Sequence, residues 1–306
     1  MRAHVQIETG TYTGNGGASR EIPTARAPDV VFTKRINGAA TGMLTRWGRR
    51  IPRNIAFIVG SGSGSAQANQ IQELTADGFV IGSGQNQNTA LYAYLALSFG
   101  EAKHVWQDGV YYGTGVDGLE VRGDYVGTEF LPDYLTIVRA TAGYPMAFRT
   151  AAHSGDAAQT WTGTQGANVV QTLESNGFTL GTATSTNGAD YFYWLALKQH
   201  AGMVVGSYTG TGAEQTIEAG FQPAAVFVKA RTAADAGLFL SDGMVANGIK
   251  SIPVSAATED TAGIIALTSS GFTVGTSAGA NAAAVPYVYM AFAAGSFNAP
   301  WTRSQV

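Results

Sequence analysis

The chain has 306 residues, a net charge of −3 at pH 7 and only 13% charged residues, with 40 glycines and no cysteine. Without cysteine it can form neither a disulfide framework nor a thiolate metal site. Many glycines with few charges favour turns and short strands. The first residues lack an apolar signal segment, and the longest apolar run, Tyr191–Leu197, is too short to cross a bilayer. We therefore expect neither a secretory signal nor membrane contact.

Two short motifs each occur three times. The first is Tyr-x-Gly-x-Gly, and the second, later in each copy, is Gly-Phe-x-x-Gly. The first motif starts at Tyr12, Tyr111 and Tyr208, and the second at Gly78, Gly177 and Gly271. The spacings are 99 and 97 residues for the first motif, and 99 and 94 for the second. This regularity predicts three tandem repeats of about a hundred residues, each large enough to hold its own core.

The predicted boundaries follow from this period. The first repeat covers residues 1–100, the second 101–205 and the third 206–295. Residues 296–306 do not match the repeat pattern, and we expect them to form a C-terminal arm that docks elsewhere. The connections between repeats are short, so neighbouring repeats are expected to pack closely.

The expected elements run in the same order in each repeat. A strand enters the first glycine turn, and a proline then opens a β-rich run such as Pro28–Lys34. A helix of about two turns is expected at Ala66–Leu74 in the first repeat. The Gly-Phe motif forms a short strand, and Tyr92–Leu97 ends the repeat as a central strand, because both of its faces are apolar. Together these elements predict an all-β protein of three tandem β-sandwich, jelly-roll-like domains.

The order of these motifs resembles a Gly-rich β repeat domain of virion and tail-associated structural proteins in tailed bacteriophages. The resemblance covers almost all of the chain, and it includes the Pro-Asp run that typically ends in lysine. Lys34 and Lys229 keep that lysine, whereas the second repeat has Val138 and the third has Ala224 in place of the aspartate. Neither the lysine nor the aspartate is present in all three copies, so a binding role of either residue cannot be common to the three repeats. The resemblance implies a particle component without a named activity.

The sequence offers little for catalysis. None of the four histidines has a metal-ligand spacing, and neither histidines nor acidic pairs recur between the repeats. We therefore predict that the protein is not an enzyme, with no catalytic residue, no metal site and no cofactor.

The strongest local signal is a basic cluster with one aromatic residue in the first repeat. It comprises Lys34, Arg35, Arg46, Trp47, Arg49, Arg50 and Arg53. Residues 1–100 carry nine basic and five acidic residues, whereas residues 101–205 carry five and ten. Such a cluster can bind an acidic protein surface or nucleic acid, or can form a solvated loop. The net negative charge of the chain argues against nucleic acid, so we predict a protein interface.

These observations, with the resemblance, predict a structural virion protein of a tailed bacteriophage. The expected role is capsid decoration or cementing, in which a trimer or pseudo-trimer binds the outer capsid surface and stabilises the head. Its partner would be the major capsid protein or another virion protein, and it would reside on the particle after synthesis in the host cytoplasm. The alternative is a tail fibre or receptor-binding protein that recognises carbohydrate through exposed aromatic residues. For Tyr92, Trp194 and Tyr289, however, a place in the core is expected.

Overall fold

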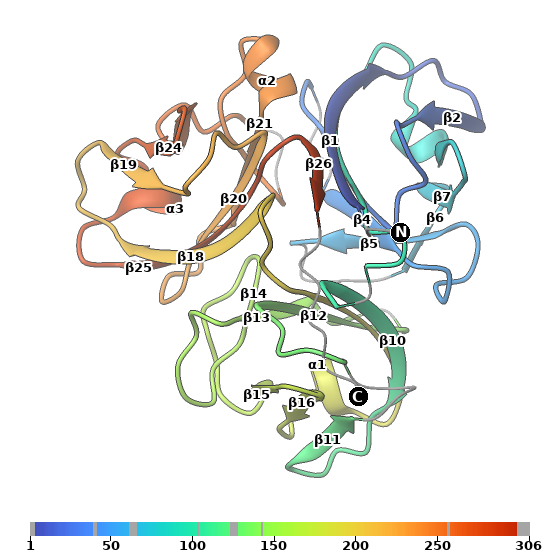
Figure 1. The fold of residues 1–306 in the computed structure, drawn as a ribbon, viewed down its shortest axis with the longest axis vertical. Coiled ribbons are helices and arrows are strands. Elements are labelled where there is room, and N and C mark those ends of the chain that lie inside the picture. Colours follow the sequence, from blue (N-terminus) through green and yellow to red (C-terminus); the bar gives the residue numbers. More distant parts are fainter. Residues whose placement is uncertain are drawn as a thin grey trace.

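Each repeat folds as a β-sandwich of a larger and a smaller antiparallel sheet, which confirms the predicted all-β class and the three sandwiches. The structure is a computed structural model, and it describes residues 4–38, 42–60, 66–102, 104–122, 128–141, 143–255 and 258–298. Figure 1 shows the three sandwiches as three lobes around a common centre.

In the first repeat the larger sheet has the strand order β26-β1-β9-β3-β4-β5-β6, where β26 (Gly295–Asn298) comes from the end of the described chain, and the smaller sheet has the order β2-β8-β7. The elements are β1 (His4–Thr13), β2 (Ser19–Pro23), β3 (Val30–Arg35), β4 (Met43–Trp47), β5 (Ile55–Val59), β6 (Ala66–Ala68), β7 (Ile71–Leu74), β8 (Gly78–Gly82), the 3-10 helix η1 (Ser83–Gln85) and β9 (Leu91–Ser98).

The second repeat has the sheets β10-β17-β12-β13-β14 and β11-β16-β15. Its elements are β10 (Trp106–Tyr112), β11 (Leu119–Arg122), β12 (Tyr134–Arg139), β13 (Ala147–Thr150), β14 (Gln159–Thr160), β15 (Val170–Glu174), β16 (Gly177–Leu180), α1 (Thr184–Asn187) and β17 (Tyr191–Leu197).

The third repeat has the sheets β18-β25-β20-β21-β22 and β19-β24-β23. The expected boundary between residues 205 and 206 falls inside β18, whose residues from Met203 onward pair with β25, so the third repeat begins earlier than expected. Its elements are β18 (Met203–Thr209), β19 (Gln215–Glu218), β20 (Ala225–Ala230), β21 (Leu238–Ser241), α2 (Asp242–Ala246), β22 (Ile252–Pro253), β23 (Ile264–Leu267), β24 (Gly271–Val274), α3 (Ala278–Asn281) and β25 (Pro286–Phe292), followed by β26 (Gly295–Asn298).

The last strand of each repeat is central and buried on both faces, as predicted. In the first repeat β9 lies between β1 and β3. Its residues alternate between two clusters: Tyr92 and Tyr94 face the smaller sheet, whereas Leu95 and Leu97 face the middle of the molecule. Tyr12, from the first motif, stacks on Tyr92 with ring centroids 5.0 Å apart. Equivalent stacks at 5.2 and 5.1 Å occur in the other two repeats.

A buried asparagine holds the Tyr-x-Gly-x-Gly turn in every repeat. Asn86 accepts a hydrogen bond from the Asn15 N–H at 3.0 Å and donates to the Gly17 carbonyl at 3.0 Å. Asn187 and Asn281 bind the turns of the second and third repeats in the same way. The second glycine of the motif has φ between 74° and 79° in all three copies, which glycine adopts without a Cβ clash. The repeated motif is thus explained by the turn it forms.

The prediction of a helix at Ala66–Leu74 is wrong. The segment forms the strands β6 and β7, with a turn between them at Asn69, whose φ is 59°. The strand β6 pairs with β5, and β7 pairs with β8 through Leu74 and Phe79. Pairing with the neighbouring strands β5 and β8 overrides the local preference of an alanine- and glutamine-rich segment for helix.

The expectation of three self-contained cores needs correction. The first two repeats have outer cores between their two sheets, but a larger cluster joins the inner faces of all three larger sheets. Phe227 of the third repeat lies 5.4 Å from Phe32 of the first and 5.5 Å from Trp161 of the second, measured between ring centroids. Phe57 and Tyr193 join the first and second repeats at 5.7 Å. The repeats therefore share a core at the centre of the molecule.

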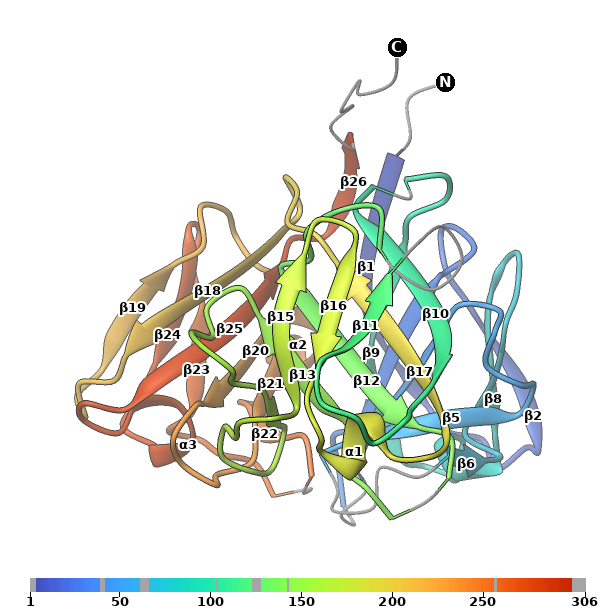
Figure 2. The ribbon, with the colours of Figure 1, turned by 90° about the horizontal axis from the view of Figure 1, so that it is seen from below.

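The C-terminal arm closes the ring of repeats. The strand β26 pairs antiparallel with β1, from His4 opposite Asn298 to Ile7 opposite Gly295. Figure 2 shows β26 beside β1 at one end of the molecule, with α1 and α3 at the other end. The ring of Phe297 also packs over Gly202, where a Cβ would lie 2.4 Å from it. Residues 296–298 of the expected arm thus pair with the first repeat, and residues 299–306 lie outside the described part of the chain.

The shared core predicts that residues 206–295 do not fold when expressed alone. The isolated third repeat would expose the inner face of β20 and β21, including Phe227 and Phe239, which are 1% and 0% exposed in the full chain. We expect the fragment to aggregate or to lack a cooperative thermal transition, whereas the full chain unfolds cooperatively. Circular dichroism melts with size-exclusion chromatography would test this. A monomeric fragment with a sharp transition would contradict the shared core.

Candidate functional site at the junction of the first two repeats

The structure separates the predicted basic cluster into buried and accessible residues. Lys34, Arg46 and Trp47 are only 0%, 3% and 1% exposed. Buried side chains cannot contact a partner at the surface, so the predicted interface role fails for these three. The accessible members are Arg35, Arg49, Arg50 and Arg53.

Arg46 stabilises the segment that follows β4. Its guanidinium donates to the carbonyls of Pro52 at 2.8 Å and Ile51 at 2.9 Å, and also to the carbonyl of Ile55. Burial lowers the pKa of Arg46 to about 10. Arg149 holds the corresponding position in the second repeat and also donates to three carbonyls. Both arginines are therefore structural.

Trp47 and Lys34 belong to the interior. The indole N–H of Trp47 donates to the Trp194 carbonyl at 3.1 Å, which ties the first repeat to the second. By strand alternation Lys34 shares the inner face of β3 with Phe32. Burial lowers the pKa of Lys34 to about 7, and it lowers the pKa of Lys229, at the equivalent position of the third repeat, to about 8.

The accessible arginines do not form one patch. Arg35 lies at the end of β3 that pairs with Tyr92, and its guanidinium donates to the Asn37 carbonyl and to Gln87 Oε1, each at 2.6 Å. Arg49, Arg50 and Arg53 instead follow β4, at the opposite end of that sheet. The structure thus brings together three of the seven predicted residues.

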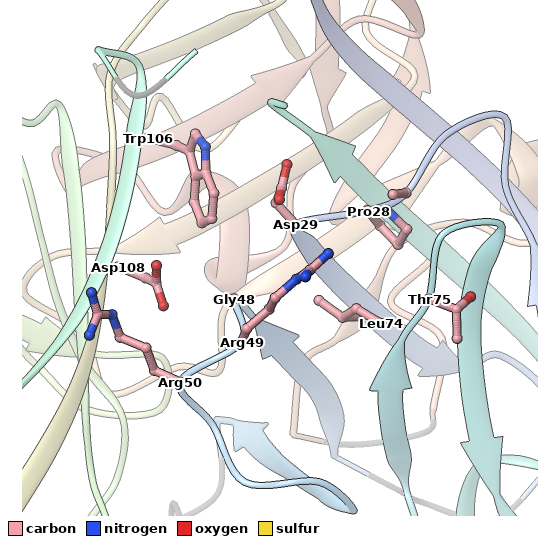
Figure 3. A pocket seen from close by; sticks show the side chains of 10 residues that line it. Pro28, Asp29, Gly48, Arg49, Arg50, Leu74, Thr75, Trp106 and Asp108 are labelled. Atoms are coloured by element: carbon pink, nitrogen blue, oxygen red, sulfur yellow. The ribbon is translucent and has the colours of Figure 1, made fainter. Parts of the chain in front are cut away.

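Arg49 and Arg50 line a pocket of about 400 Å³ between the first and second repeats, which we call the junction pocket (Figure 3). The first repeat contributes the segment before β3, the turn after β4 and the end of β7, and the second contributes β10. The lining residues are Ala27, Pro28, Asp29, Gly48, Arg49, Arg50, Leu74, Thr75, Trp106 and Asp108. Gly48 allows Asp108 to approach, because a Cβ there would lie 2.2 Å from its carboxylate.

Two carboxylates in the junction pocket are partly desolvated. Burial raises the pKa of Asp29, while hydrogen bonds from the N–H groups of Phe99 and Gly100, and the charge of Arg49, oppose this rise. Burial also raises the pKa of Asp108; Arg50 opposes that rise, and Asp29 adds to it. Each carboxylate therefore has an arginine as its electrostatic neighbour.

A second hollow of about 560 Å³ adjoins the junction pocket on the surface of the first repeat. The two hollows share Arg49 and Arg50, and the second also includes Arg53, which forms an ion pair with Glu73. The side chain of Arg53 is 81% exposed, so this pair is open to solvent and contributes little to stability. Four arginines and one glutamate line the second hollow, so it forms a positively charged surface beside the junction pocket, where two carboxylates balance two arginines.

The described residues include no cluster of three or more histidine and acidic side chains that could hold a metal ion. His153 is buried, and its Nδ1 accepts a hydrogen bond from the Thr150 N–H at 3.1 Å. Among the helices in the described part of the chain, none is both long and apolar enough to span a membrane.

Sequence reasoning missed the contribution of the second repeat to the site. Trp106 and Asp108 lie more than 50 residues beyond the basic cluster, and only the packing of β10 against the first repeat brings them there. A signal was present in the repeat alignment. The positions equivalent to Trp106 and Asp108 carry Ile7 and Thr9 in the first repeat, so the polar and aromatic pair departs from the repeat pattern.

Arg46 and Arg49 differ in their predicted effects on stability. Replacing Arg46 with Ser would leave three backbone carbonyls without their donor, so we expect a loss of about 2–4 kcal/mol in the free energy of unfolding. Arg49→Ser, at an exposed position, should change it by less than about 0.5 kcal/mol. Urea denaturation of both variants measures the difference, and equal stabilities would refute the structural role of Arg46.

Because burial lowers the pKa of Lys34, we predict that the stability of the protein rises with pH. Its amine is neutral in the folded protein above about pH 7, whereas in the unfolded chain it stays protonated up to its ordinary pKa of 10.5. Unfolding therefore takes up a proton between these values, and stability increases with pH across this window. We expect Lys34→Met to weaken the rise in Tm between pH 7 and pH 10, with Lys229 retaining part of it. Lys250→Met, at an exposed position, is the control, and an unchanged pH profile in Lys34→Met would contradict the assignment.

A family model covers residues 125–295, which is more than half of the chain and includes most of the second repeat and the third. No curated protein matches the chain. The chain belongs to the family described as a domain of unknown function, DUF7483.

Proposed function

We propose that the protein is a structural component of a tailed-bacteriophage particle, most simply a capsid decoration protein that binds the outer surface of the head and stabilises it. The observation that carries this proposal is the closed arrangement of three similar sandwiches around one shared core (Figure 1). A single chain thereby presents three related outer faces, as a trimer of one-domain subunits would. Such a pseudo-trimer suits a position where three similar capsid surfaces meet.

Stable retention on such a surface follows from several modest contacts within one rigid body. Once one repeat is bound, the others are held at high effective concentration near their own contact sites. The shared aromatic core and the pairing of β26 with β1 keep the three repeats in a fixed geometry. This rigidity lowers the entropic cost of engaging all three contacts.

The unequal charges of the repeats would orient the protein on its partner. The first repeat carries nine basic and five acidic residues, while the second carries five and ten. Arg49, Arg50 and Arg53 give the first repeat an accessible basic surface at one edge. We propose that this surface contacts an acidic patch of the major capsid protein or another virion protein, in a non-enzymatic role.

A second candidate is a receptor-binding or tail-fibre protein that recognises carbohydrate. The aromatic residues of the final strands cannot serve it, because Tyr92, Trp194 and Tyr289 are 0%, 1% and 7% exposed. The exposed pair Tyr112 and Tyr191 in the second repeat is what favours this candidate. The two side chains are 53% and 58% exposed, with ring centroids 5.1 Å apart in an edge-on arrangement.

The interface proposal predicts salt-sensitive release from particles. We expect the combined variant Arg49→Ser, Arg50→Ser and Arg53→Ser to co-sediment with purified particles at lower occupancy, and to dissociate at lower salt, than the unmodified protein. Arg26→Ser, at another exposed arginine of the same repeat, serves as the control. Arg46 stays unchanged because it is structural. Equal occupancy of the triple variant across the whole salt series would rule out this surface as the anchor.

A further inference from the structure

We propose that the junction pocket binds a neutral saccharide unit. This inference does not require the particle-binding role, although the junction pocket shares Arg49 and Arg50 with the outer arginine surface, because it rests also on Asp29, Trp106 and Asp108. It also differs from a glycan platform at Tyr112 and Tyr191, because Tyr112 lies at the opposite end of β10 from Trp106 and Tyr191 of β17 pairs with it there.

The fold itself does not require the polar lining of this pocket. The strand register aligns Trp106 with Met203 in the third repeat, and Asp108 with Val205. Both of these apolar residues are buried. The second repeat has a hollow at the position where the first repeat borders the junction pocket. This hollow measures about 210 Å³, and His153 takes the place of Arg50 there.

The junction between the third and first repeats is closed by direct contacts. There Thr9 Oγ1 donates to Asp242 Oδ1 at 2.7 Å, and a Cβ on Gly243 would lie 3.0 Å from Thr11. Another junction of this same molecule therefore forms without two carboxylates, two arginines and a tryptophan. Their presence at one junction only points to a role other than packing.

The junction pocket is lined by two carboxylates and two guanidinium groups, so its charges balance. Figure 3 shows Arg50 beside Asp108 and Arg49 extending towards Asp29. A ligand with one net charge would meet as much repulsion as attraction here. A polyhydroxylated ligand is suited to such a wall, because each hydroxyl can donate to a carboxylate and accept from a guanidinium. Hydroxyl donors would also satisfy the partly desolvated carboxylate of Asp108.

The remaining lining suits the apolar face of a sugar ring. Trp106, Pro28 and Leu74 supply carbon surface beside the charged groups. Trp106 is held in place by stacking on Phe99, with ring centroids 5.4 Å apart and an interplanar angle of 16°. A volume of about 400 Å³ lies at the lower end of the range of small-molecule sites, which suits one or two sugar units.

Saturation-transfer NMR on the full-length protein tests this proposal. The probes are D-glucose, D-galactose, N-acetyl-D-glucosamine and L-rhamnose, with L-alanine and inorganic phosphate as zwitterionic and anionic competitors. We expect at least one sugar to bind, and neither competitor to displace it. Absence of a signal from all four sugars at concentrations of about 50 mM, or displacement by either competitor, would overturn the proposal.

Two variants locate the binding in the pocket. Asp108→Thr and Trp106→Met introduce residues that the equivalent positions of other repeats already carry, so the fold should tolerate both. Each should raise the Kd about tenfold, or about 1.4 kcal/mol. Asp117→Asn removes an exposed carboxylate of the same repeat and should leave the Kd unchanged. Sugar binding that survives in both pocket variants would place the site elsewhere and refute the assignment. Thermal melts would establish that both variants are folded.

The sugar and particle proposals can fail separately. Asp108→Thr should retain particle binding while it loses the sugar, because Asp108 lies inside the pocket and not on the outer surface. The triple arginine variant removes pocket residues as well, so it tests only the anchor. Loss of particle binding in Asp108→Thr would mean that the pocket itself contacts the particle, which would overturn a separate saccharide site.

Discussion

The packing of three inner sheet faces against one another is the interaction on which the rest of the structure depends. Each larger sheet is apolar on both faces: one faces the smaller sheet of its own repeat and the other faces the neighbouring repeats. Phe227 is the clearest case, because its ring contacts aromatic residues of the first and second repeats at the same time. A repeat taken from this ring would expose a large aromatic surface to water, so the ring of three is the stable unit.

This shared core also explains which parts of the repeat vary. The turn held by Asn86 and its counterparts lies outside the central cluster and keeps its hydrogen bonds in all three copies. Positions at the junctions need only fill space against a neighbour, and they differ from copy to copy. At one junction Thr9 meets Asp242, and at another Trp106 and Asp108 border an open pocket. Divergence at the junctions could therefore create a binding site without disturbing the sandwiches.

The basic cluster shows how far residue type alone can mislead. Arg46 and Arg49 are close in the sequence and have the same charge, yet one is buried against three carbonyls and the other lines an accessible pocket. Arg46 lies within β4, between β3 and β5, whereas Arg49 lies in the turn that follows this strand, and composition alone does not show this difference. The particle role and the saccharide site accordingly rest on the accessible arginines and on the junction pocket, while Lys34, Arg46 and Trp47 stabilise the interior.

The sequence by itself determined the all-β class, the three copies and the central position of strands such as β9, because glycine turns and apolar alternation are local properties of the chain. It misassigned Ala66–Leu74, where pairing with the neighbouring strands β5 and β8 overrides helix preference. Only the tertiary structure showed the shared core, the closure of the ring by β26, and the meeting of Arg50 with Asp108. These features depend on contacts between segments far apart in the chain, whose partners are chosen by the fit of whole surfaces rather than by any local pattern.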